Sequence, residues 1–448
     1  MPDRILLKNA RLACPESIIR NDLLIEGERI AKIGSELSAE GAQVVDCHGH
    51  LVMPGLIDAH VHFRQPGHVD KGSIHSESRA AVLGGVTSFL DMPNTNPPTL
   101  SHERLLEKKA IAGRDSVANY GFYLGATPDN LDEIKKAPSH DVAAVKVYLG
   151  STTGDLTMDG EGPVRRLFEQ CPFMICAHCE DDAIIQRHYQ IYKDRYGSSI
   201  PIAAHSSIRS RDCCVASSQF AIALAQDTGA RLHIMHLSTR DELELLRPFA
   251  DVPAWERQIS AEACLPHLYF SDSDFIHLGG YIKCNPAIKR EFDRLALTRA
   301  VSSGLITTVG SDHAPHEKPL KNSNTYERCP SGTPTVQFAL LALLELCKRG
   351  ELTLEDVVRA ASYNVARRFG IRERGAIAEG NYADLVVVSM DENTMVQEED
   401  VVSKCGFTPF AGTHFTNRIR HTFVSGRHVV EEGRLISDQP GCALYFEH

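Results

Sequence analysis

The 448-residue chain has little that points to a membrane, a secretory route or a nucleic acid. It lacks a long apolar run, since the uncharged residues 332–344 fall short of the roughly 20 residues that a membrane-spanning helix needs. Its first residues lack the basic start and apolar core of a signal peptide. Positive charge is in deficit, with 47 Lys and Arg against 58 Asp and Glu, which disfavours a nucleic-acid-binding surface. We therefore expect a cytoplasmic protein that acts on a small molecule, without a membrane or nucleic-acid partner.

The cysteines do not form a disulfide framework. There are 13 of them, an odd number, scattered without regular spacing, as is usual in a reducing compartment. Cys176 and Cys179 have the CxxC spacing of a redox or zinc motif, but no second CxxC completes a four-cysteine site. We expect these two cysteines to serve packing.

The strand and helix patterns divide the chain into two parts. Predicted strands with no helix between them open the chain, and strands return after a helical stretch at residues 353–369. Between about residue 56 and that helix, short apolar strands alternate with longer helical stretches, which favours a (β/α)8 barrel. The expected terminal strands are 5–12, 22–25, 29–33, 42–46, 384–388 and 420–424, and the expected barrel strands include 85–90, 119–124, 143–148, 173–177, 231–235 and 305–309.

The predicted fold class is therefore α/β. A TIM-like barrel would occupy residues 55–369, and a small composite β-sandwich domain would be built from both termini, residues 1–54 plus 370–448.

The most informative segment carries His60 and His62. In an extended strand alternate side chains share one face, so both imidazoles can bind one metal ion. The pair follows an apolar run and a Pro-Gly turn, which predicts a position at the exposed end of a buried strand. His48 and His50 have the same spacing but precede that turn beside a glycine, so we expect a surface bend there. A metal-centred hydrolytic site is the leading hypothesis.

Four further polar residues follow predicted barrel strands: Lys146, His178, His236 and Asp312. Each alone has an ordinary explanation, because a His can cap backbone and a Lys can extend to solvent. Together they would bury several charges on one face of the barrel, which favours a metal as compensation. An ammonium cannot bind a cation, but a lysine with a lowered pKa can be carbamylated by CO2 and then bridge two ions as a carboxylate.

These residues resemble the binuclear zinc pattern of the amidohydrolase superfamily, and the residues around them are similar to dihydroorotases of the long, bacterial-type branch. The similarity covers essentially the whole chain. It includes HVHFRQPG at 60–67, DMPNTNP at 91–97, AHCED at 177–181, HLST at 236–239, NP at 285–286, SDHAPH at 311–316, TPF at 408–410 and Gly412.

The resemblance implies two zinc ions per subunit, bound by His60, His62, His178, His236 and Asp312 and bridged by a carbamate on Lys146. It implies reversible ring opening of dihydroorotate to N-carbamoyl-aspartate in pyrimidine biosynthesis, by a metal-bridging hydroxide, with Asp312 as catalytic proton carrier. The implied substrate contacts are Arg64, Asn94 and His316 for the carboxylate, and Asn285 with the loop around Pro330 and Gly332 for the ring.

The residues themselves support the first of these contacts. Arg64 lies two positions beyond His62 and so shares its strand face, where a guanidinium can bind a carboxylate through two hydrogen bonds. A surface ion pair for Arg64 and a turn position for Asn94 are the ordinary alternatives.

Several alternatives stay open at this point. Asp155 or Asp159 could replace the carbamylated lysine as the metal bridge. The substrate could be allantoin, a dihydropyrimidine or a hydantoin, which lack the carboxylate that Arg64 would bind. The chain could also be an inactive scaffold for aspartate transcarbamoylase, although a complete ligand set speaks against it. We further expect a homodimer, and the polar residues 317–329 could form a lid.

Overall fold

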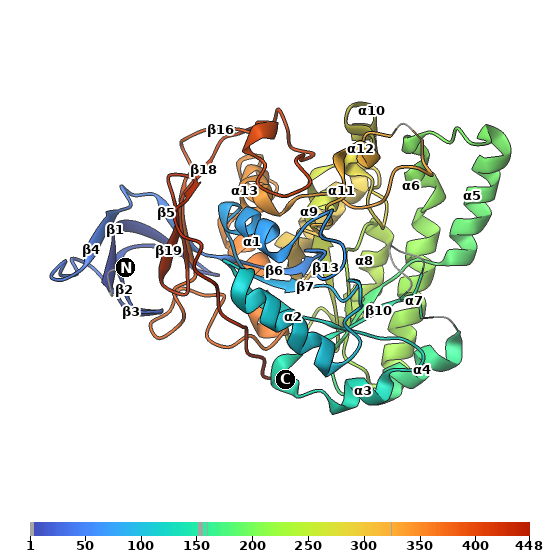
Figure 1. The fold of residues 1–448 in the computed structure, drawn as a ribbon, viewed down its shortest axis with the longest axis horizontal. Helices are drawn as coiled ribbons and strands as arrows, with labels where there is room; N and C mark the ends of the chain where they lie inside the picture. Colours follow the sequence, from blue (N-terminus) through green and yellow to red (C-terminus); the bar gives the residue numbers. More distant parts are fainter. Residues whose placement is uncertain (1–3, 151–155, 159, 324) are drawn as a thin grey trace.

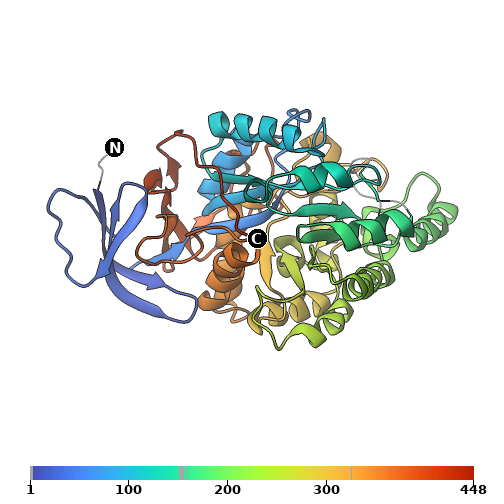
Figure 2. The same ribbon diagram turned by 90° about the horizontal axis from the view of Figure 1, so that it is seen from below.

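The computed structural model describes residues 4–150, 156–158, 160–323 and 325–448. Its larger part is a parallel barrel with eight strand positions, surrounded by helices (Figures 1 and 2). Two hydrogen-bonded runs of strands make the barrel, joined where Tyr123 N donates to Asp91 O at 3.2 Å and where His62 N donates to His313 O at 2.8 Å. The first run is β6 (Leu56–Val61), β7 (Val86–Asp91) and β8 (Asn119–Phe122); the second is β9 (Leu124–Gly125), β10 (Val145–Tyr148), β11 (Ile175–His178), β12 (Leu232–Ile234), β13 (Ile259–Cys264) and β14 (Thr308–Gly310), with β8 and β9 sharing one position.

The helices form where the sequence provides caps and apolar faces. In α8, for example, the Thr239 hydroxyl accepts from Glu242 N at 3.2 Å while the Glu242 carboxylate accepts from Thr239 N at 3.1 Å. Gly229, with φ of +78°, ends α7 in a left-handed conformation that glycine adopts without strain. The helices are α1 (Ile74–Leu83), α2 (His102–Asp115), α3 (Leu131–Lys136), α4 (Glu161–Gln170), α5 (Asp182–Tyr196), α6 (His205–Ile208), α7 (Arg211–Thr228), α8 (Arg240–Leu246), α9 (Leu265–Tyr269), α10 (Phe275–Leu278), α11 (Glu291–Ser302), α12 (Lys318–Lys321), α13 (Ala339–Lys348), α14 (Leu354–Val358) and α15 (Asn364–Arg368).

The barrel and its strands confirm the predicted fold class, with one strand missed. β13 reads Ile-Ser-Ala-Glu-Ala-Cys, which lacks the continuous apolar run used to recognise the other strands. Ser260 hydrogen-bonds to His233 of the neighbouring strand β12, and Glu262 hydrogen-bonds to His60 of β6, so both side chains face the barrel interior. Small apolar residues alternate with them and belong to the main hydrophobic core. Apolar runs alone therefore do not predict this strand, because its inward-facing residues are polar.

The second part is a sheet built from both ends of the chain (Figure 1). The N-terminal and C-terminal strands meet where β5 pairs antiparallel with β15. The sheet contains β1 (Arg4–Ala13), β2 (Ile18–Glu26), β3 (Arg29–Gly34), β4 (Gln43–Asp46), β5 (Leu51–Pro54), β15 (Leu385–Ser389), β18 (Arg418–Val424), β19 (Arg427–Glu431) and β20 (Arg434–Leu435). The short strands β16 (Thr394–Met395) and β17 (His414–Phe415) pair separately.

Strand β15 links this sheet to the barrel, since one of its faces packs in the main hydrophobic core and the other in the core of the small domain. Val386 and Val388 belong to the main hydrophobic core, whereas Leu385 and Val387 belong to the core of the small domain. This double burial explains its uninterrupted apolar sequence. The end of the chain also returns to the barrel, where Leu444 N donates to Tyr120 O at 2.8 Å.

Within the described ranges, no helix combines the length and the apolar character needed to cross a membrane.

Candidate metal centre

His60, His62 and Asp312 meet at the carboxyl ends of β6 and β14. Asp312 Oδ1 lies 3.4 Å from His60 Nε2 and 3.4 Å from His62 Nε2. Two ligands about 2.0 to 2.1 Å from a tetrahedral zinc ion are separated by about 3.3 Å, so these spacings suit a shared ion. Each of the three side chains offers one ligand atom, and these atoms lie within 4.8 Å of one another.

His178 and His236, at the ends of β11 and β12, form the second half of the site. His178 Nδ1 lies 2.9 Å from His236 Nε2, again close to the spacing of two ligands on one ion. The rings of His236 and His60 are 5.2 Å apart, so the two halves adjoin. His236 Nδ1 has no hydrogen-bond partner among the described residues. The four predicted histidines and Asp312 are therefore brought together.

Lys146 lies inside the barrel on β10 and is only 1% exposed. Its ammonium nitrogen has no hydrogen-bond partner among the described residues and lies 5.0 Å from the ring centre of Tyr148. Burial lowers the pKa of Lys146. The uncharged amine is the form that reacts with CO2, so the environment suits the predicted carbamate. The alternative bridging residues Asp155 and Asp159 lie outside the described residues.

The protonation states also suit metal binding. Burial lowers the pKa of His62 to about 4 and lowers the pKa values of His178 and His236, so these imidazoles are neutral at pH 7. Burial opposes ionisation of Asp312, but His60 and His62 outweigh it and lower its pKa to about 2. The site thus presents free nitrogen lone pairs and an ionised carboxylate.

Three residues behind the ligands orient the imidazoles. Glu262 Oε1 lies 2.7 Å from His60 Nδ1, Asn94 Oδ1 lies 2.8 Å from His62 Nδ1, and Glu180 Oε2 lies 3.1 Å from His178 Nε2. Such oxygen partners fix the imidazole tautomer and leave the other nitrogen for the metal. Glu262 and this role of Asn94 were missed by the sequence analysis. The alternating polar residues of β13 were the signal that could have revealed Glu262.

Three site residues have positive φ angles, which are uncommon outside glycine: Arg64 at +70°, His236 at +38° and Asp312 at +47°. Such conformations typically cost about 1–3 kcal/mol each and concentrate at functional sites. Here they occur where the chain leaves β6, β12 and β14.

A small cavity beside the metal ligands contains most of the predicted substrate residues. Arg64 is 4% exposed, and its Nε donates to Pro315 O at 3.0 Å. Asn285 has a buried Oδ1 without a hydrogen-bond partner among the described residues. The cavity is lined by His62, Arg64, Asn94, Asn285, Asp312, Ala314, Ser331 and Gly332.

His316 and Pro330 are not among the residues that line this cavity, but His316 contacts two residues that do. His316 Nε2 lies 3.3 Å from Arg64 Nη2 and 2.9 Å from Ser331 O, and Pro330 O accepts from Lys321 Nζ at 2.9 Å. Gly332 has φ of +142°, and a Cβ there would lie 2.5 Å from Ala314 O. Only glycine therefore lets this loop approach the site so closely.

The described part of residues 317–329 is anchored as well as polar. Lys321 and Cys329 are buried, and Lys283 Nζ donates to the carbonyls of Tyr326 and Cys329 at 2.6 Å each. The lid role of this segment stays a prediction.

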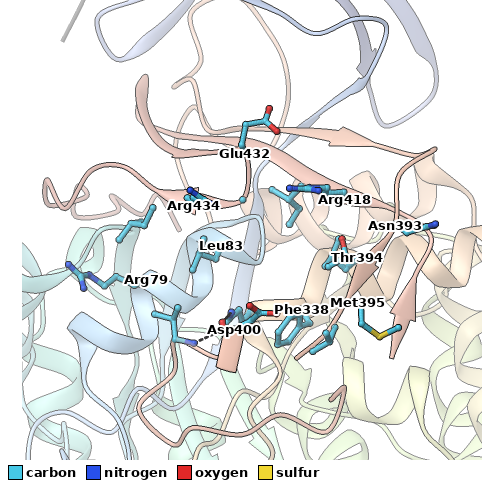
Figure 3. Close-up of a pocket in the computed structure, with 17 residues that line it drawn as sticks. Arg79, Leu83, Phe338, Asn393, Thr394, Met395, Asp400, Arg418, Glu432 and Arg434 are labelled. Carbon is cyan, nitrogen blue, oxygen red and sulfur yellow. Dashed lines mark hydrogen bonds between the residues drawn. The ribbon is translucent and has the colours of Figure 1, made fainter. Parts of the chain in front are cut away.

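A larger cavity, of about 650 Å³, lies between the barrel and the small domain (Figure 3). Its lining includes Arg79, Phe338, Asp400 and Arg418 but no His, Cys or Lys. It lacks the imidazole ligands of the site above, so size alone does not identify the reactive centre.

The structure is consistent with a surface bend at His48 and with a packing role for Cys176 and Cys179. His48 is 74% exposed and follows β4 in a turn. Cys176 and Cys179 are buried, and neither belongs to a potential metal group among the described residues.

Comparison with known proteins identifies the family. Residues 51–429 match the amidohydrolase family. The chain belongs to the amidohydrolase family. A dihydroorotase of Halobacterium salinarum is 34% identical over 396 residues, which cover 87% of this amidohydrolase and 89% of that protein. An allantoinase of Deinococcus radiodurans is 30% identical over 457 residues, which cover 98% of each.

The solved structure of an L-hydantoinase from Arthrobacter aurescens matches this amidohydrolase with a TM-score of 0.93 at 27% identity, covering 99% of this chain and 100% of that one. These relatives carry different names within the cyclic amidohydrolase branch, to which this chain also belongs. Enzymes of this family generally depend on metal ions, in agreement with the ligand groups described.

Proposed function

We propose that this amidohydrolase is a dihydroorotase, which reversibly hydrolyses the cyclic amide of dihydroorotate to N-carbamoyl-aspartate. The observation that carries the proposal is the environment of Arg64. Its guanidinium is buried beside the metal ligands and makes no ion pair with a carboxylate in the described part of the chain.

A buried, unpaired guanidinium is unfavourable, and burial lowers the pKa of Arg64 to about 10. A carboxylate on the substrate would supply the missing partner through a charge-assisted, bidentate contact. Dihydroorotate carries such a carboxylate next to its cyclic amide, whereas allantoin, dihydrouracil and hydantoin do not. Asn94 and Asn285 line the same cavity, where Asn94 would help to bind the carboxylate and Asn285 would contact the ring.

The side chains fit two zinc ions, with the spacings and orphaned buried nitrogens described above. A carbamate on Lys146 would complete the donor set as a bridge. Bound zinc would lower the pKa of a water molecule and polarise the ring carbonyl. The ligands would be His60, His62, His178, His236, Asp312 and carbamylated Lys146.

Asp312 would carry the proton. Support for this role is that its carboxylate lies 3.4 Å from both His60 and His62 and lines the same cavity as Arg64. In the ring-opening direction it takes the proton from the water and gives it to the departing nitrogen. In ring closure the same carboxylate works in reverse.

The runner-up is an allantoinase or a dihydropyrimidinase-like enzyme, because relatives of this chain carry such names. Turnover of dihydroorotate, dihydrouracil, hydantoin and allantoin should be compared on one sample, with zinc content measured in parallel. We expect a marked preference for dihydroorotate and about two zinc ions in the barrel site of each chain after dialysis against zinc-free buffer. Preference for an uncharged ring would reject the proposal, and a zinc-free chain without turnover would favour the inactive scaffold.

The homodimer and an aspartate transcarbamoylase partner stay predictions. Light scattering of the purified chain, alone and mixed with that enzyme, tests both.

A further inference from the structure

A second group of metal-ligating side chains lies in the small domain. His421 is in β18, and His428 and Glu431 are in the neighbouring strand β19. Their ligand atoms all lie within 4.8 Å of one another. None of the three belongs to the barrel or to the site described above.

A β-bulge brings the three side chains to one face of this hairpin. Phe423 pairs with His428, but the register shifts between Phe423 and Thr422, so that His421 pairs with Glu431. In an unbroken register, His421 would pair with Val430. A bulge is a common means of redirecting a side chain in a sheet, and here it places a carboxylate opposite an imidazole.

The two imidazoles are already at the spacing of metal ligands. His421 Nδ1 lies 3.1 Å from His428 Nε2, compared with the roughly 3.3 Å that separates two ligands on a tetrahedral zinc ion. The same spacing occurs between the proposed ligands of the barrel site, at 2.9 Å and 3.4 Å. His428 stacks on Phe423 at 4.6 Å between ring centres, which fixes its ring.

Burial keeps the nitrogens available for an ion. Burial lowers the pKa values of His421 and His428, so both rings are neutral at pH 7. Glu431 is exposed and leaves the group open to solvent.

The charges around the group are compatible with a cation. Glu432 Oε1 lies 3.8 Å from His421 Nε2 and adds negative charge. The nearby guanidinium of Arg420 is balanced by ion pairs with Glu392 and Glu432. His50 also faces His421 and lies 3.9 Å from Glu392. Glu432 also lines the cavity of Figure 3, whereas His421, His428 and Glu431 are not among its lining residues.

We propose that His421, His428 and Glu431 form a peripheral binding site for a divalent transition-metal ion. Two imidazoles and one carboxylate suit Zn2+, Ni2+ or Cu2+, whereas Mg2+ and Ca2+ prefer oxygen ligands. Solvent would supply the fourth ligand, so the ion exchanges more readily than those held inside the barrel. Its bound form links β18 to β19 and stabilises the small domain.

The test measures zinc binding to the whole chain by equilibrium dialysis and elemental analysis. The variants are His421→Gln and Glu431→Gln, and His48→Gln is the matched control because His48 is an exposed histidine of the same domain. We expect the wild type and the control to bind one zinc ion more than His421→Gln at micromolar free zinc. Glu431→Gln, whose exposed side chain is not needed for packing, should weaken the Kd of this ion several-fold. Turnover of the cyclic amide should be equal in all four proteins.

Equal zinc stoichiometry and Kd in the wild type and both site variants would overturn the proposal. It would also be overturned if His48→Gln lost as much zinc as His421→Gln, because that result indicates scattered surface binding. Cobalt substitution gives an independent check, since the absorption of the extra Co2+ should appear only at several-fold higher free cobalt in Glu431→Gln, even if His421→Gln fails to fold. The outcome does not depend on the substrate of the barrel site.

Discussion

Replacing Arg64 with methionine tests the proposed substrate most directly. Methionine keeps an unbranched stem with the same Cβ, so the positive φ of +70° is no more strained than in the native protein. The change removes a charged contact to the substrate carboxylate worth about 2–5 kcal/mol when desolvated. Because about 1.4 kcal/mol corresponds to a factor of ten, kcat/KM for dihydroorotate should fall by roughly 30- to 4,000-fold.

The stability of this variant provides a second readout. Within the described residues Arg64 Nε donates to Pro315 O and Arg64 Nη2 lies 3.3 Å from His316 Nε2; losing the backbone hydrogen bond costs about 1 kcal/mol, while removing a buried charge without an ion pair offsets that loss. Arg374 is the matched control, since it is also buried but is ion-paired with Asp384. Arg374→Met should lower the free energy of unfolding by about 3–5 kcal/mol because it leaves Asp384 unpaired.

The assay follows ring opening of dihydroorotate and of dihydrouracil in parallel, with zinc content and urea unfolding measured on each variant. Arg64→Met should lose dihydroorotate turnover while zinc content and unfolding stay close to wild type. Any slow hydrolysis of dihydrouracil should be unchanged, because that substrate has no carboxylate. Normal turnover of dihydroorotate by this variant, or equal losses for both substrates, would refute the role assigned to Arg64.

Three further results are expected. Lys146→Ala should lose at least one zinc ion and nearly all activity, with partial rescue by short carboxylic acids; unchanged zinc and turnover would exclude a carbamate bridge. Asp312→Asn should depress ring opening and ring closure by similar large factors at matched zinc content, and near-normal rates in a fully metallated variant would remove Asp312 from proton transfer. Burial lowers the pKa of His233 to about 3, so the folded protein keeps this imidazole neutral while the unfolded chain takes up a proton below about pH 6.5. The free energy of unfolding therefore falls as the pH decreases from about 6.5 towards 3. Urea unfolding of wild type and His233→Gln at pH 7.5 and 5 should show that the substitution reduces the acid-induced loss by about 2 kcal/mol, and identical losses would contradict this.

Much of the barrel and its site could be predicted from the sequence because the metal ligands lie at the ends of strands that are mostly apolar. His178 is the last residue of β11, and Asp312 follows β14. Parallel strands bring their carboxyl ends together at one end of the barrel. The expected strands therefore agree with the structure to within a few residues. The same reasoning failed at β13, whose inward residues are polar because they serve the site, as Glu262 does for His60.

Contacts that depend on loop conformation could not be predicted in this way. Asn94 follows β7 and reaches His62 because of the path of its loop, for which the sequence offers only turn-forming residues. Gly332 illustrates the same limit. Its φ of +142° and its contact with Ala314 O explain why a glycine is needed, but only the folded loop reveals what it approaches.

The histidine pair of the small domain shows why local sequence rules cannot identify every potential site. Ser425 and Gly426, with φ of +46° and +76°, form the two-residue turn between β18 and β19, and such a turn can be expected from the sequence. Regular pairing from that turn would put His421 opposite Val430, an apolar residue that cannot bind a metal. The single-residue bulge changes the partner to Glu431. A bulge arises from how the strands pack against the rest of the molecule, so the third ligand of this group becomes visible only in the folded structure.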